Sequence, residues 1–178
     1  MMIEYLRAET LKYLITALDG EKALEIMETL DECGFFSFPA SIKYHSNEEG
    51  GLCAHSVEVT DALIDLTNKL GLKWQNERSP YIVGLFHDLC KLDDYEWKCA
   101  DEYGYNNRKK CSGHGEKSVI FAQQLLKLTE EEIACIRWHM GAFDDKENWN
   151  YYTRAINQFP NVLYTHTADM IATHINGV

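Results

Sequence analysis

The segment PYIVGLFHDLCKL, at residues 80–92, is apolar on nearly every side when it is drawn as a helix. A helix of this kind is normally buried. It nevertheless carries His87 and Asp88 next to each other. A carboxylate is costly to bury unless a cation compensates for its lost hydration. The fold must therefore bring positive charge to this helix.

Helical spacing of apolar residues also dominates the rest of the chain, so the sequence predicts an all-α domain. Ser79 and Pro80 are a typical N-cap and first helical residue, and Thr129 with Glu132 forms a capping-box pattern. Alternation after Tyr95 predicts one small β-hairpin over about 95–111. The predicted helices cover about 2–18, 21–31, 52–69, 79–92, 115–127, 130–140 and 152–175, the last in one or two pieces.

Composition narrows the class of protein. With 178 residues and 46% hydrophobic residues, we expect one domain over 1–178, in which helices within about 1–36 pack on the core. The net charge of −11 argues against duplex nucleic acid and anionic membranes as partners. We find neither a signal-peptide pattern nor a run of roughly 18 apolar residues that could span a membrane.

The cysteines indicate a reducing compartment. None of them forms a C-x-x-C pair, which argues against a zinc ribbon or a redox pair. We therefore expect reduced thiols in a cytoplasmic protein. The cysteines are Cys33, Cys53, Cys90, Cys99, Cys111 and Cys135.

Further polar residues interrupt other apolar helices. They are His55, His114, His139 and Asp169. Any one of them has an ordinary explanation as a hydrogen-bonded core residue or a helix cap. Together with His87 and Asp88 they need a common explanation, and a divalent metal supplies it. Imidazole and carboxylate are suitable ligands for Mn, Fe, Co, Zn or Ni.

Lys91 follows Asp88 by three residues and His87 by four, so a continuous helix would place all three side chains on one face. A lysine beside metal ligands is suited to meet an anionic group. The alternative is a surface lysine whose stem covers apolar residues.

The ordered pattern H…HD…H…H…D resembles the HD-domain superfamily of metal-dependent phosphohydrolases. The flanking sequences GGLCAHS, LFHDLCK, GHGEKS, RWHMG and YTHTADMIA carry the resemblance over roughly residues 38–175. The segment FPASIKYHSNEEGGLCAHS is also similar to the HD domain of certain bacterial 3′-to-5′ exoribonucleases. The resemblance implies a compact bundle of about six to eight helices and a dinuclear metal site.

The resemblance also implies roles for individual residues. His55, His87, Asp88 and Asp169 would hold one divalent ion, and His114 and His139, with Asp88 bridging, would hold a second. A metal-bridging hydroxide would attack phosphorus, and Asp88, Lys91 and Asp169 would serve in catalysis. Lys91, His45 and Lys117 would contact substrate, although His45 is equally typical of a surface loop and Lys117 of an exposed helix face.

Three functions share this ligand set. The first is a phosphomonoesterase or phosphodiesterase acting on a small, nucleotide-like phosphate ester. The second is a mixed-valence diiron oxygenase. The third is a metal-binding module that senses a nucleotide without turnover. Two divalent ions would make the cleft locally positive, so that an acidic chain can still bind a small phosphorylated partner. The sequence leaves the oligomeric state open.

Overall fold

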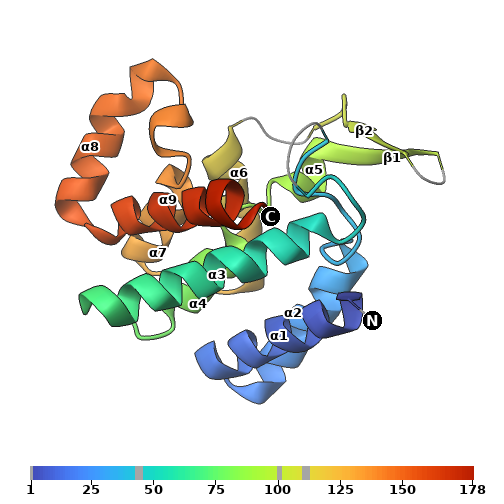
Figure 1. The fold of residues 1–178 in the computed structure, drawn as a ribbon, viewed down its shortest axis with the longest axis horizontal. Coiled ribbons are helices and arrows are strands. Elements are labelled where there is room, and N and C mark those ends of the chain that lie inside the picture. The colour runs from blue at the N-terminus through green and yellow to red at the C-terminus, as the bar shows by residue number, and fades with distance from the viewer. Residues whose placement is uncertain (1, 43–45, 100–101, 110–112) are drawn as a thin grey trace.

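Helix α3 (Gly51–Leu70) lies at the centre of the structure and packs along α4 (Ser79–Phe86) (Figure 1). Val59 and Leu63 of α3 and Leu85 of α4 are fully buried between the surrounding helices. The structure is a computed structural model that describes residues 2–42, 46–99, 102–109 and 113–178. One hydrophobic cluster joins this pair to the other long helices.

The other elements surround this pair (Figure 1). Helices α1 and α2 pack against each other, and α1 also contacts α3 and α4. On the opposite side, α9 packs on both α3 and α7. These elements are α1 (Met2–Ala17), α2 (Gly20–Glu32), α5 (Lys91–Asp94), β1 (Tyr95–Cys99), β2 (Glu102–Tyr105), α6 (His114–Leu125), α7 (Glu130–Trp138), α8 (Trp149–Gln158), α9 (Asn161–Ile171) and a π-helical turn over Ala172–Asn176.

The predicted all-α class with one small hairpin is confirmed. Strands β1 and β2 pair antiparallel, with Tyr95 opposite Tyr105, within the predicted range 95–111. The last predicted helix is two helices, because the chain breaks at Pro160 between α8 and α9. Among the described residues, no helix combines the length and the apolar character needed to cross a membrane.

The helix caps agree with the sequence at one site and differ at another. Glu132 N donates to Thr129 Oγ1 and Thr129 N donates to Glu132 Oε2, as the capping-box pattern predicted. Ser79, in contrast, is the first residue of α4 and not its N-cap. Its hydroxyl donates to Glu132 Oε1 at 3.0 Å. Buried Glu132 therefore joins the start of α4 to the start of α7.

Close approach of α3 and α4 depends on Gly84. A Cβ atom at this position would lie 2.5 Å from Thr60 Oγ1 and 2.6 Å from Thr60 Cα. Gly84 also provides the carbonyl to which His87 Nδ1 donates, at 2.8 Å. Any larger residue here must therefore separate α3 from α4 just before the His87–Asp88 pair.

We predict that Gly84→Ala lowers the free energy of unfolding by about 1–3 kcal/mol, because overpacking outweighs the better helix propensity of alanine. Denaturant titration measures this change. Gly20→Ala is the matched control, since a Cβ atom at Gly20 meets nothing within 4 Å. Equal effects of the two substitutions would contradict the packing explanation.

Candidate metal centre

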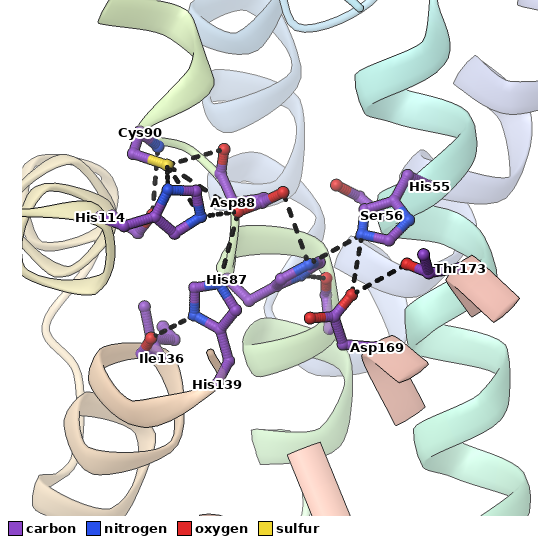
Figure 2. A network of polar contacts seen from close by, with 12 residues as sticks. His55, Ser56, His87, Asp88, Cys90, His114, Ile136, His139, Asp169 and Thr173 are labelled. Carbon is purple, nitrogen blue, oxygen red and sulfur yellow. Dashed lines mark hydrogen bonds and ion pairs between the residues drawn. The ribbon is translucent and has the colours of Figure 1, made fainter. Parts of the chain in front are cut away.

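The six predicted ligands converge on one place, and four of them stand at or just after helix ends (Figure 2). Five of them line one cleft, and the sixth, His87, is fully buried beside it. His55 lies in the second turn of α3 and Asp169 lies in α9. His87 and Asp88 follow the last residue of α4, His114 is the first residue of α6, and His139 follows α7. Five separate elements thus contribute to a single site.

The backbone leaves the α-helical hydrogen-bond pattern where α4 was expected to continue. Helix α4 ends at Phe86, so the prediction that His87 and Asp88 lie inside a helix reaching residue 92 was wrong. Beyond Phe86, successive backbone hydrogen bonds join residues three apart in the sequence, such as the bond from Lys91 N to Asp88 O at 3.1 Å. Side chains three residues apart eclipse in such a stretch. Asp88 and Lys91 therefore still line the same cleft.

Three of the histidines are held by their Nδ1 atoms. Nδ1 of His55 contacts the backbone oxygen of Val178 at 3.0 Å. His87 and His139 make the same contact to Gly84 O at 2.8 Å and Ile136 O at 2.7 Å. A backbone oxygen can only accept, so each Nδ1 carries the proton. In the neutral rings, Nε2 is then an unprotonated acceptor.

These Nε2 atoms face one another and two carboxylates. His55 Nε2 lies 3.2 Å from His87 Nε2 and 3.2 Å from Asp169 Oδ1. His139 Nε2 is buried, has no hydrogen-bond partner and lies 3.4 Å from Asp88 Oδ1. Buried acceptors that meet without a donor repel each other, and a cation between them, either a proton or a metal ion, relieves this repulsion. The arrangement therefore fits a divalent metal bound by imidazole and carboxylate.

The donor atoms form overlapping sets. Among the described residues, three sets of three side chains have donor atoms within 4.8 Å of one another. Each neighbouring pair of sets shares a residue, so the donors run continuously across the cleft. The sets are His55 with His87 and Asp169, His87 with Asp88 and His139, and Asp88 with Cys90 and His114.

His114 differs from the other histidines. Its Nε2 lies 2.6 Å from Asp88 Oδ1, a contact that requires a proton between the two atoms. A metal ion bound here would take the place of that proton.

Cys90 lies beside His114, a contact that the sequence analysis did not single out. Its sulfur is 3.4 Å from His114 Nδ1 and 3.5 Å from Nε2. Because these distances are nearly equal, the sulfur packs against the ring and is not in line with either nitrogen. The spacing of two residues after Asp88 is the signal that could have found it.

Burial and neighbouring charges together set the pKa values of the candidate ligands. Burial lowers the pKa of His87 to about 4, which keeps this ring neutral at pH 7. Burial opposes ionisation of Asp88, but the charge of Lys91 and the contact with His114 hold its pKa well below the usual range. The pKa of Asp169 falls to about 2: burial opposes ionisation here too, but the contact with His55 outweighs it, and the same contact raises the pKa of His55. Neutral imidazole and ionised carboxylate are the ligand forms that metals bind.

The cleft itself has a volume of about 410 Å³. Its wall includes the apolar side chains of Met140, Phe143 and Met170, together with Lys91. A cavity of this size suits a small molecule and not a long polymer.

Of the other two predicted substrate-binding residues, Lys117 is described by the structure and does not line this cleft. Lys117 is buried, and its Nζ pairs with Asp93 Oδ2 at 3.0 Å and Asp94 Oδ1 at 2.8 Å. It therefore joins α6 to α5, and the structure does not bring it to the candidate site. His45 lies outside the described residues.

Comparisons with known proteins found no relative of this chain. No protein-family model matches the chain, and neither curated proteins nor solved structures gave a match. The candidate site therefore rests on the chain's own sequence and geometry.

We predict that Asp88→Asn removes at least one equivalent of bound divalent metal while the protein stays folded, because the amide lacks the negative charge that faces His114 and His139. Metal analysis of reconstituted, desalted protein measures the stoichiometry. Asp93→Asn is the matched control, since both carboxylates are 7% exposed but Asp93 pairs with Lys117. Unchanged metal content in Asp88→Asn would remove Asp88 from the site.

Proposed function

We propose that this chain is a metal-dependent phosphohydrolase that cleaves a small, nucleotide-like phosphate ester. The observation that carries the proposal is the convergence of unprotonated Nε2 atoms and carboxylates in a cleft that also contains Lys91. The resemblance to the HD-domain superfamily supports the same reaction. A phosphomonoester and a phosphodiester are both compatible with this site.

Two divalent ions are the proposed cofactors. His55, His87 and Asp169 would hold one, and His114 and His139 would hold the other, with Asp88 between them. Bound ions of this kind lower the pKa of water and polarise phosphoryl oxygens. The protein's part is to hold imidazoles and carboxylates in fixed positions, and the Nδ1 contacts of His87 and His139 orient two of the imidazoles.

Lys91 is the proposed phosphate-binding residue. Of the described residues that line the cleft, it is the one with a permanent positive charge. Burial would lower its pKa, but the charge of Asp88 outweighs burial and keeps the pKa above its ordinary value. Its Nζ lies 5.7 Å from the centre of the Tyr95 ring, a cation–π contact that holds the ammonium in place. A fixed ammonium can bind a phosphoryl oxygen while charge develops on it.

The rest of the substrate would meet the apolar wall of the cleft. Met140, Phe143 and Met170 offer contact to an uncharged ring or chain. The net charge of −11 repels long polyanions more than a single phosphate ester. Together these features favour a small ester with an uncharged organic group, such as a nucleotide.

The reaction class can be tested directly. We expect protein loaded with Mn²⁺ or Co²⁺ to release phosphate or a nucleoside from one member of a phosphoester panel, at the same rate in air and under strict anoxia. Hydrolysis involves no redox change, so oxygen is not required. If only the iron-loaded protein turns over, and only with oxygen uptake, the chain is an oxygenase. Tight nucleotide binding without turnover would identify a sensing module.

Lys91→Ala should lower kcat/KM on the best phosphoester by about 10²- to 10³-fold, the usual cost of losing one donor to a developing oxyanion. Metal content should stay unchanged, because the ammonium does not bind metal. Lys98→Ala, on strand β1 with its ammonium paired to Glu96, is the control that removes a lysine outside the cleft. An unchanged kcat/KM in Lys91→Ala would show that Lys91 does not contact the substrate.

A further inference from the structure

The Nδ1 contact of His55 differs in origin from those of the other two histidines. His87 and His139 each donate to the carbonyl three residues earlier, so their own helices orient them. His55 instead contacts the backbone oxygen of Val178, which is 123 residues away in the sequence. The orientation of His55 therefore depends on tertiary structure at the C-terminal segment.

A reversal of the chain brings Val178 to this place. Helix α9 continues into the π-helical turn Ala172–Asn176, and Gly177 then adopts a φ of +77°. This left-handed residue allows Val178 N to donate to Ala172 O at 3.1 Å. Figure 1 shows this end of the chain lying against α3. We call residues 172–178 the C-terminal clasp.

The clasp has further contacts to α3 and α9, the helices that carry His55 and Asp169. The Asn176 side chain donates to the carboxylate of Glu58, which lies three residues after His55 on α3. The Thr173 hydroxyl lies 3.5 Å from Asp169 Oδ1 (Figure 2). The clasp thus joins α3 to α9 beside His55 and Asp169.

Without the Val178 oxygen, the proton on the His55 ring has a different preferred position. His55 Nε2 lies 3.2 Å from Asp169 Oδ1, which attracts a proton to Nε2. A ring protonated on Nε2 cannot bind a metal through that atom. The Val178 oxygen favours the opposite tautomer by accepting from Nδ1.

We propose that the C-terminal clasp is a positioning element that keeps His55 in the tautomer able to bind metal. This inference rests on the proposed metal centre and adds a determinant that lies outside its ligands. It makes the metal affinity of the His55, His87 and Asp169 set depend on the backbone conformation at Gly177.

A pair of matched glycine substitutions tests the proposal. Gly177 and Gly71 both have positive φ, at +77° and +64°, and a Cβ atom at either would meet nothing within 4 Å. Valine strongly disfavours this conformation, whereas asparagine tolerates it. Gly177→Val should therefore displace Val178 by a backbone effect alone. Gly71→Val imposes the same strain at the end of α3, far along the helix from His55.

Calorimetric titration of metal-free protein with Co²⁺ is the first measurement. We expect Gly177→Val to weaken one class of Co²⁺ site by about 10- to 100-fold, the usual effect of losing the partner of a ligating histidine. Gly71→Val should leave Co²⁺ affinity unchanged, and Gly177→Asn should bind within a few fold of the wild type. Gly177→Ala carries a smaller penalty and repeats the test if the valine variant does not fold.

Nitrogen NMR of the metal-free histidine rings is the second measurement, because a purely structural role would not change the tautomer. The His55 proton should move from Nδ1 in the wild type toward Nε2 in Gly177→Val. Equal Co²⁺ affinity in both valine variants, with the tautomer unchanged, would overturn the proposal. If the wild-type protein itself binds no Co²⁺, the proposed metal centre fails, and the two failures are therefore distinguishable.

Discussion

Repulsion between buried acceptors is the constraint on which the site depends. Backbone oxygens hold the Nδ1 protons of His55, His87 and His139, so three Nε2 lone pairs point toward each other and toward Asp88 and Asp169. Such an arrangement is costly in an apolar interior unless a cation joins the acceptors. The remainder of the molecule can be understood as the scaffold that makes this convergence possible.

In this scaffold, an end of each of α4, α6 and α7 lies beside the candidate metal centre. The short α4 ends at Phe86, which places His87 and Asp88 in a tight turn and leaves Lys91 over the same cleft. Ligands from five elements can therefore meet around Asp88.

Much of the fold and the convergence of the ligands could be predicted from sequence, since apolar periodicity reveals helices and polar residues within them stand out. The turn after Phe86 could not, because LFHDLCK contains no proline or glycine to end a helix. Lys117 was predicted to contact substrate, with an exposed helix face as the alternative, because its partners Asp93 and Asp94 are distant in sequence. The Val178 oxygen is a backbone atom, and no residue type identifies it.

Anomalous scattering from crystals of Mn²⁺-loaded protein tests the central claim most directly. The account predicts two adjacent manganese peaks, one bound by the Nε2 atoms of His55 and His87 with Asp169, the other beside Asp88, His114 and His139. Absence of any peak in the cleft at saturating Mn²⁺, with the Nε2 atoms still facing one another, would contradict it. A single peak with His114 and His139 turned away would contradict the dinuclear assignment.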